Sequence, residues 1–230
     1  MKTVAIITAR GGSKRIPRKN IREFMGRPMI AYAIDASLRA DIFDTVMVST
    51  DDAEIADISR GLGAEVPFMR SEKTANDFAT TADVLCEVLD NYKKLGKRFD
   101  NLCCIYPCVP FLDAEILAKA FKKFSSAGCD SLMPVARYSY PIQRALQIGA
   151  DGFAEYREPA FRNARSQDLT PTYHDAGMFY FSKTAAFLET KSLVAKKTVL
   201  YEMDERRVQD IDTLEDWKMA ETKYKTIYNA

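Results

Sequence analysis

The sequence lacks the features that mark membrane, secreted and nucleic-acid-binding proteins. No apolar run reaches the roughly 18 residues that a membrane-spanning helix needs, and the N-terminus has no signal-peptide pattern. The formal net charge is only +1, so the chain has no overall basic surface that would favour nucleic acid or an acidic membrane. We therefore expect a cytoplasmic protein with neither a nucleic-acid nor a membrane partner.

Cysteine is too sparse and too irregularly spaced for a disulfide framework. There are five cysteines, an odd number, and Cys103 and Cys104 lie inside an apolar run. Cys104 and Cys108 do not form a CxxC pair, and no second pair could complete a zinc site. We expect reduced and mostly buried thiols.

Two common glycine motifs for nucleotide binding are also absent, namely the P-loop GxxxxGK[ST] and the dinucleotide fingerprint GxGxxG. The chain instead begins with an apolar run, Val4 to Ile7, which is typical of a buried parallel strand. Gly11 and Gly12 follow this strand. We call residues 10–22 the basic loop, because no acid appears between Lys2 and Glu23 and six cations do: Arg10, Lys14, Arg15, Arg18, Lys19 and Arg22.

A strand that runs into a glycine loop exposes backbone N–H groups that can wrap phosphate oxygens, and nearby cations supply the countercharge. This order favours a phosphate cradle over its alternative, a solvated basic surface. The stretch ARGGSKRIPRKNI, residues 9–21, resembles the nucleotide-binding signature of the CMP-sugar synthetases, which are cytidylyltransferases that activate sialic-acid-like sugars. The resemblance implies that the nucleotide is bound by Arg10, Gly11, Gly12, Ser13, Lys14, Lys19 and Asn20.

The rest of the chain predicts one α/β domain over residues 1–230, with no linker that could separate two domains. Apolar runs predict strands at 4–7, 45–49, 64–68, 101–106, 130–136, 178–181 and 208–211. Helical spacing predicts helices at 28–39, 54–61, 81–95, 113–124, 183–189 and 213–224. The resemblance implies a Rossmann-like nucleotidyltransferase fold, similar to glycosyltransferase A, with a mostly parallel sheet flanked by helices.

The segment 137–175 has poor periodicity and many prolines, aromatics and arginines, as an inserted lobe or loop does. We call it the arm, because the resemblance implies an inserted arm that pairs two subunits and reaches the neighbour's site. A homodimer with sites completed in trans is the prediction. His174, the only histidine, is either a substrate contact or structural. The predicted sugar-binding residues are Tyr106, Gln143, Arg144, Arg165, Tyr173 and His174.

Two pairs of aspartates could bind a metal. Asp210 and Asp212 are two residues apart, so on a strand both carboxylates would share one face, where they could hold Mg²⁺. By spacing alone they could equally be a surface pair, but the resemblance implies that this QDIDT motif holds the metal. Asp51 and Asp52 stand where a helix N-cap belongs, and capping is the predicted role.

The cytosine pocket is implied by the resemblance alone. In the family, an arginine after the third strand and groups before the next helix line this pocket, which suggests Arg70, Ala79, Thr80 and Thr81. For Thr80 the alternative is a helix N-cap.

The implied reaction is attack by the anomeric hydroxyl of a nine-carbon 2-keto sugar acid on the α-phosphorus of CTP, with loss of pyrophosphate. Catalysis would rest on positioning and on charge from Arg10, Lys14, Lys19 and Mg²⁺. Asp212 or a group on the substrate is the candidate base.

Three features resemble the pseudaminic acid branch of the family: Tyr106 where the family usually has glutamine, PIQRAL at 141–146 and YHDAG at 173–177. N-acetylneuraminic and legionaminic acid are the alternative sugars. A non-catalytic nucleotide-binding protein is the alternative of another class, and the acidic pair Asp210 and Asp212 counts against it because a mere binder needs no metal.

Overall fold

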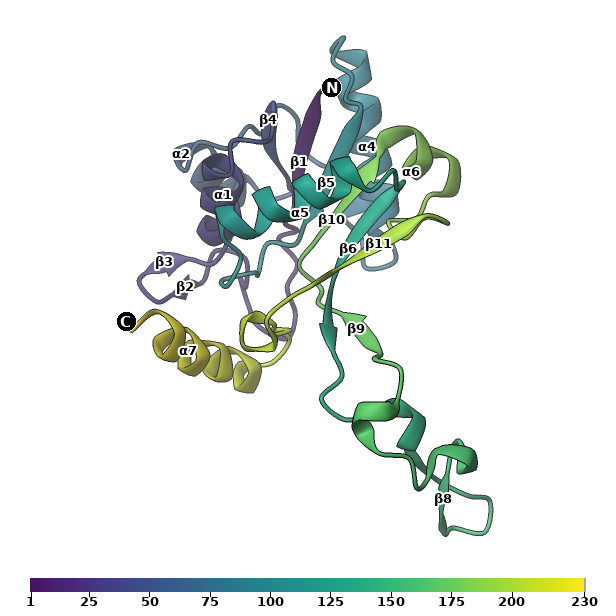
Figure 1. Ribbon diagram of the computed structural model, residues 1–230. Helices are drawn as coiled ribbons and strands as arrows, with labels where there is room; N and C mark the ends of the chain where they lie inside the picture. Colours follow the sequence, from purple (N-terminus) through teal and green to yellow (C-terminus); the bar gives the residue numbers. More distant parts are fainter. Residues whose placement is uncertain (230) are drawn as a thin grey trace.

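Buried apolar strands form the centre of the structure, a computed structural model that describes residues 1–229. The main sheet has the strand order β11-β6-β10-β5-β1-β4, and β9 pairs with β6 (Figure 1). Its strands are β1 (Thr3–Thr8), β4 (Thr45–Ser49), β5 (Asn101–Ile105), β6 (Ser131–Arg137), β9 (Tyr173–Asp175), β10 (Phe179–Lys183) and β11 (Thr198–Glu202). Two short hairpins, β2 (Glu23–Phe24) with β3 (Arg27–Pro28) and β7 (Leu146–Ile148) with β8 (Ala154–Tyr156), lie outside it.

The register of the central strands fixes where a site can form. In β1, Ile7 pairs with Val48 of β4 and with Ile105 of β5, and both pairings are parallel. The carboxyl ends of these strands therefore meet at one edge of the sheet, where open α/β sheets bind ligands. The predicted α/β fold is confirmed, but the sheet is mixed, because β10 runs antiparallel to both β5 and β6.

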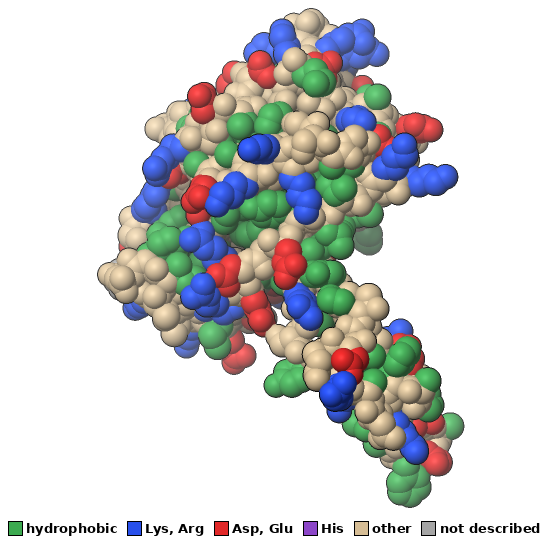
Figure 2. All heavy atoms as spheres, in the orientation of Figure 1, with side chains coloured by type: hydrophobic (Ala, Val, Ile, Leu, Met, Phe, Trp, Pro, Cys, Tyr) green, Lys and Arg blue, Asp and Glu red, His purple; other side chains and the backbone are tan. Residues whose placement is uncertain are grey.

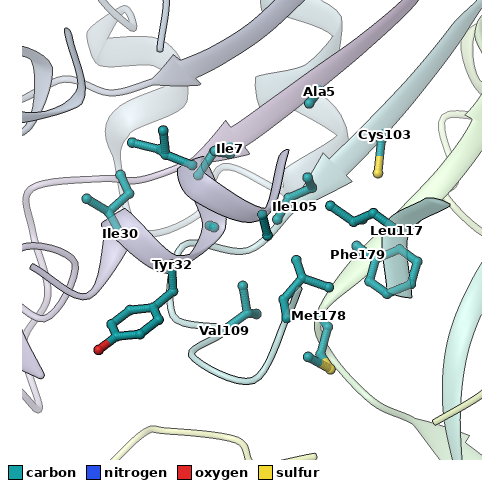
Figure 3. Close-up of a cluster of buried hydrophobic side chains, with 14 of the residues drawn as sticks. Ala5, Ile7, Ile30, Tyr32, Cys103, Ile105, Val109, Leu117, Met178 and Phe179 are labelled. Carbon is teal, nitrogen blue, oxygen red and sulfur yellow. The ribbon is translucent and has the colours of Figure 1, made fainter. Parts of the chain in front are cut away.

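Helices cover both faces of the sheet because alternate residues of each strand point to opposite faces. The α-helices are α1 (Ile30–Arg39), α2 (Ala53–Gly61), α3 (Glu72–Ala75), α4 (Thr81–Lys94), α5 (Ala114–Ser126), α6 (Thr184–Thr190) and α7 (Leu214–Tyr228). Ala5 and Ile7 belong to the core cluster that includes residues of α1, α5 and α7. Val4 and Ile6 face the second cluster, with residues of α4 and α6. Figure 3 shows part of the first cluster, including Ile7 of β1, Ile30 of α1 and Ile105 of β5.

The helix starts follow local sequence signals. Asp52 caps α2 by accepting from the Ile55 N–H, which confirms its predicted capping role. Thr80 with Asp83, and Thr213 with Asp216, form capping boxes at α4 and α7. The Thr213 box confirms the helix predicted there. These caps fix the ends of α2, α4 and α7 at the edge of the sheet where the strands end.

Two predicted strands are wrong. Residues 64–68 contribute only a single bridge, Met47 to Glu65, and Pro67 then lacks the N–H that would extend the ladder. Residues 208–211 are irregular, because the N–H of Val208 closes a turn onto the carbonyl of Glu205. Strand β11, a half-buried edge strand that pairs in parallel with β6, was not predicted. Helix α1 starts at Ile30, since Pro28 belongs to the β2–β3 hairpin.

The arm leaves the sheet after β6, returns along β9 and projects away from the body (Figure 1). It is not a plain loop: it holds the β7–β8 hairpin and the short 3₁₀-helices η1 (Ile142–Arg144), η2 (Pro159–Phe161) and η3 (Ser166–Asp168). A fourth 3₁₀-helix, η4 (Glu205–Arg207), precedes α7. Tyr140, Ile148 and Phe153 on the arm are 86%, 81% and 74% exposed, and hydrophobic side chains line this projection in Figure 2.

All five cysteines are free, as predicted, and three of them are buried. Within residues 1–229, no helix combines the length and the apolar character needed to cross a bilayer.

Candidate active site

A cavity of about 420 Å³ opens at the edge of the sheet where β1, β4 and β5 end. Its lining consists of Thr8, Arg10, Ser13, Lys14, Arg15, Ile16, Lys19, Asn20, Pro107 and Asp212. A larger cavity of about 510 Å³, lined in part by Asp100, Asn101 and Lys183, lies at the opposite edge, where β5 begins. Because ligands of open α/β sheets bind beyond the carboxyl ends of the strands, the smaller cavity is the candidate site.

The basic loop is tied to the start of α2. The N–H of Gly11 donates to Asp51 Oδ1 at 2.9 Å, and a Cβ on Gly11 would come within 2.8 Å of Asp52 Oδ2. Arg18 pairs with Asp52 and Glu54, and its hydrogen bond lowers the pKa of Asp52. The Gly11 N–H thus has a carboxylate partner in this structure, and the role of Gly11 in phosphate binding stays a prediction.

Lys19 and Asn20 connect the basic loop to two distant segments. Lys19 Nζ donates to the carbonyl of Ile211 at 2.6 Å and lies 3.4 Å from Asp212 Oδ1. Asn20 Nδ2 donates to the carbonyl of Arg10 at 2.8 Å, and the Cys108 thiol donates to Asn20 Oδ1 at 3.3 Å. These contacts place the predicted metal-binding segment against the predicted phosphate cradle, although almost the whole chain separates them.

Asp210 and Asp212 do not lie on a strand, so the prediction that a strand places both carboxylates on one face is wrong. Burial raises the pKa of the Cys108 thiol to about 12, Lys19 lowers it, and the charges of Asp212 and Asp210 raise it, so both carboxylates lie within electrostatic range of this thiol. Asp212 Oδ2 also pairs with Arg15 at 2.8 Å. Among the described residues, no group of three or more His, Cys, Asp or Glu side chains could hold a metal. A two-carboxylate site fits Mg²⁺, which also takes oxygens from substrate phosphates.

The predicted cytosine contacts gather near the amino end of α4 and the carboxyl end of β4. Arg70 is only 9% exposed, and its guanidinium donates to Ser49 O at 2.6 Å and to Ser49 Oγ at 3.1 Å. Burial lowers the pKa of Arg70. Thr80 is engaged in its capping box, and the N–H of Ala79 donates to Asn76 Oδ1 at 3.0 Å. Thr81 is the first residue of α4.

Asp77, which was not predicted as a site residue, pairs with two cations of the predicted phosphate cradle. Arg10 Nη1 donates to Asp77 Oδ1 at 2.8 Å, and Lys14 Nζ to Asp77 Oδ2 at 2.5 Å. The sequence does show an acid just before the residues implied in cytosine binding. No rule of spacing, however, predicts that this acid pairs with a loop more than 60 residues earlier.

Tyr106 lies at the end of β5 and packs edge-on against Tyr180, with ring centroids 5.6 Å apart. The Tyr180 hydroxyl donates to both Asp175 oxygens, at 2.9 and 2.8 Å. Asp175 and Tyr180 were not predicted as site residues. Tyr173 and His174 lie on β9 at the base of the arm, where the His174 ring is 5.0 Å from that of Tyr138.

None of the six predicted sugar-binding residues lines the cavity of its own chain, and five of them lie on the arm. Gln143 Nε2 donates to Thr170 O at 2.8 Å, Arg165 pairs with Asp168 at 2.9 Å, and Arg144 lies 3.4 Å from Ser166 Oγ. The side-chain hydrogen bonds and the ion pair of Gln143, Arg144 and Arg165 are therefore made within the arm.

The chain matches the family described as Cytidylyltransferase over residues 4–225. It belongs to the cytidylyltransferase family. It is 38% identical to the pseudaminic acid cytidylyltransferase of Campylobacter jejuni, over 98% of this chain and 97% of that protein. It is 31% identical to the CMP-N,N'-diacetyllegionaminic acid synthase of Legionella pneumophila, over 96% and 95%. As a cytidylyltransferase the chain is a nucleotidyltransferase enzyme, which confirms the enzyme class and disfavours the non-catalytic alternative.

A solved structure shares the fold. CMP:2-keto-3-deoxy-manno-octonic acid synthetase, complexed with CTP, superposes with a TM-score of 0.70 and covers 99% of this chain and 100% of its own. Its sequence identity is 17%, so this likeness concerns the fold alone. The predicted nucleotidyltransferase fold is confirmed.

The cradle generates a prediction. Replacing Arg10 or Lys19 by alanine should weaken CTP binding or slow turnover by roughly tenfold or more, because a hydrogen bond to a charged group contributes about 1.5–3 kcal/mol. Arg39→Ala is the control, since Arg39 lies on α1, 74% exposed, 3.5 Å from Asp35. CTP titration calorimetry and steady-state kinetics would measure both effects. Equal behaviour of all three variants would make the basic loop a solvated surface.

Proposed function

We propose that this cytidylyltransferase converts CTP and pseudaminic acid into CMP-pseudaminic acid and diphosphate, in the cytoplasm. The observation that carries the proposal is the meeting of Arg10, Lys14 and Lys19 with Asp212 around one cavity at the carboxyl edge of the sheet. The Campylobacter relative, which aligns over nearly the whole length of both chains, supports the choice of sugar. N-acetylneuraminic and legionaminic acid remain the alternative substrates.

The cations suit the charge that develops in this reaction. The anomeric hydroxyl of the sugar attacks the α-phosphorus, and the bond to the bridging oxygen of pyrophosphate breaks. Negative charge then accumulates on the leaving group, which Arg10 and Lys14 would stabilise by charge-assisted hydrogen bonds. Lys19, 22% exposed and held by Ile211 O, is oriented in advance and loses little side-chain freedom on binding.

Cytidylyltransferases of this fold generally depend on a divalent cation. In this chain Asp210 and Asp212 would hold Mg²⁺ together with phosphate oxygens, because hard carboxylate oxygens are its preferred protein ligands. When bound, the ion supplies positive charge at the reacting phosphate. In the structure Asp212 pairs with Arg15 and Lys19, two cations that nucleotide phosphates would also attract. The base is either Asp212 or a group of the substrate.

The second substrate would lie over Tyr106, Tyr180 and β9. Burial raises the pKa of both Tyr106 and Tyr180, so both hydroxyls stay protonated and can serve as neutral hydrogen-bonding groups. At position 106 this chain has an aromatic ring in place of the family's usual glutamine, whose amide would donate two N–H groups. This change favours a sugar whose acyl groups are arranged differently from those of N-acetylneuraminic acid.

We also propose a homodimer in which the arm of one subunit completes the site of the other. Gln143, Arg144 and Arg165 do not line the cavity of their own chain, and the arm exposes Tyr140, Ile148 and Phe153 to solvent. A closed twofold pair would bury these aromatic and aliphatic side chains. It would also bring an arm arginine to the carboxylate of the sugar acid, an anion suited to its planar donors.

The sugar assignment is tested by pyrophosphate release. Purified enzyme with Mg²⁺ is assayed against pseudaminic, N-acetylneuraminic and legionaminic acid with each of the four nucleoside triphosphates. We expect the highest kcat/KM for pseudaminic acid with CTP. A higher value for another sugar would replace the assignment, and CTP binding without turnover of any sugar would favour a non-catalytic binder.

The metal pair gives a second prediction. Asp212→Asn should retain the fold, because Asp212 is more than one-third exposed, and lower turnover by roughly a hundredfold or more, as the loss of one key electrostatic group does. Turnover measured across a Mg²⁺ series is the readout. Near-normal activity of both Asp212→Asn and Asp210→Asn at limiting Mg²⁺ would remove the pair from the mechanism.

The arm gives a third prediction. A subunit carrying Asp212→Asn and a subunit carrying Arg165→Ala should each be inactive alone, while mixed dimers should recover part of the activity. One of the two hybrid sites then holds both wild-type residues. Light scattering that gives a monomer at the assay concentration would contradict the dimer, as would exchanged mixed dimers that stay inactive.

A further inference from the structure

Asp77 occupies the cations that a nucleotide phosphate would use. Its two oxygens accept from different partners, Oδ1 from Arg10 at 2.8 Å and Oδ2 from Lys14 at 2.5 Å. Both cations line the 420 Å³ cavity, whereas Asp77 itself does not. A carboxylate that bridges two cations with separate oxygens makes the kind of contact that a phosphate group makes.

The segment that carries Asp77 is organised on its own side of the cavity. Asn76 Oδ1 accepts from the N–H groups of Phe78 at 2.9 Å and Ala79 at 3.0 Å. Phe78 is 94% exposed, so its ring does not hold the segment against the basic loop. The two ion pairs of Asp77 are the side-chain contacts that join it to that loop across the described chain.

Asp77 is charged at neutral pH. Hydrogen bonding by Lys14 and then the charge of Lys14 lower its pKa, and Arg10 lowers it further. The pairs are solvent-exposed, with 41% of the Arg10 side chain, 76% of Lys14 and 46% of Asp77 accessible. Exposed ion pairs contribute little free energy. A ligand of higher charge can therefore displace this carboxylate.

We propose that Asp77 makes an autoinhibitory contact in the nucleotide site, where its carboxylate competes with ligand phosphates for Arg10 and Lys14. The inference rests on the proposed function, in which these cations bind the CTP triphosphate. The phosphates of CTP displace Asp77 from the two cations when the nucleotide binds. After the reaction, the carboxylate returns to the cations and favours the release of pyrophosphate. Asp77 therefore lowers the affinity of the site for both the triphosphate and the leaving group.

The test compares Asp77→Asn with Glu72→Gln by titration calorimetry. Glu72 lies in the same region, on α3, and in the described structure forms no ion pair with Arg10 or Lys14, so its variant removes one nearby charge without releasing either cation. The probes are CTP, inorganic pyrophosphate and uncharged cytidine. For Asp77→Asn we expect CTP and pyrophosphate to bind roughly fivefold more tightly, the order expected for two exposed ion pairs, with cytidine unchanged. Glu72→Gln should alter none of the three to this extent.

Kinetics provide a second readout, because pyrophosphate should inhibit the Asp77→Asn enzyme at roughly fivefold lower concentration. Unchanged or weaker binding of CTP and pyrophosphate would overturn the proposal. So would an equal change for cytidine, which would assign the effect to base contacts on the same segment, or an equal gain with Glu72→Gln, which would assign it to general charge. Wild-type enzyme that binds CTP but turns over no candidate sugar would sink the sugar assignment and leave this comparison intact. If the wild-type enzyme bound neither CTP nor pyrophosphate, both the proposed function and the proposed role of Asp77 would be overturned.

Discussion

The concentration of positive charge on the basic loop is the constraint on which the rest of the site depends. Six cations within residues 10–22 repel one another, and the chain as a whole carries a net charge of only +1. Carboxylates from three other segments provide the compensation: Asp52 at α2, Asp77 before α4 and Asp212 before α7. Each of these ion pairs draws a distant part of the chain toward the edge of the sheet where the strands end.

These carboxylates differ in what they do for the loop. Asp52 also caps α2 and is only 20% exposed, so its pair with Arg18 belongs to the scaffold. Asp77 and Asp212 are 46% and 37% exposed, and they contact cations that line the cavity. Water screens such pairs, so they can be exchanged for phosphate oxygens at small cost. The scaffold pair fixes the shape of the cradle, while the exposed pairs keep its cations in place and accessible.

The arm shows what a single chain leaves incomplete. Its hairpin and 3₁₀-helices form backbone hydrogen bonds within the arm, yet apolar side chains such as Ile148 and Phe153 remain exposed. A surface of this kind marks an interaction site more often than a solvated loop. The division of labour that we propose follows from this: the sheet edge of one subunit supplies phosphate and metal chemistry, and an arm supplies the donors for the sugar acid.

Local sequence determined much of this protein. The apolar run at β1, the Thr213 capping box and the basic loop each depend on residues close together in the chain, so pattern alone located them. Tertiary structure decided the rest. Residues 198–202 form a strand because they pair with the edge of β6, whereas residues 208–211 have no such partner in the described structure. The partner of Gly11, the meeting of Lys19 with Ile211 and the bridge from Asp77 to Arg10 are contacts across long stretches of chain. No local pattern encodes such contacts, because the register of the parallel strands brings these segments to the same edge.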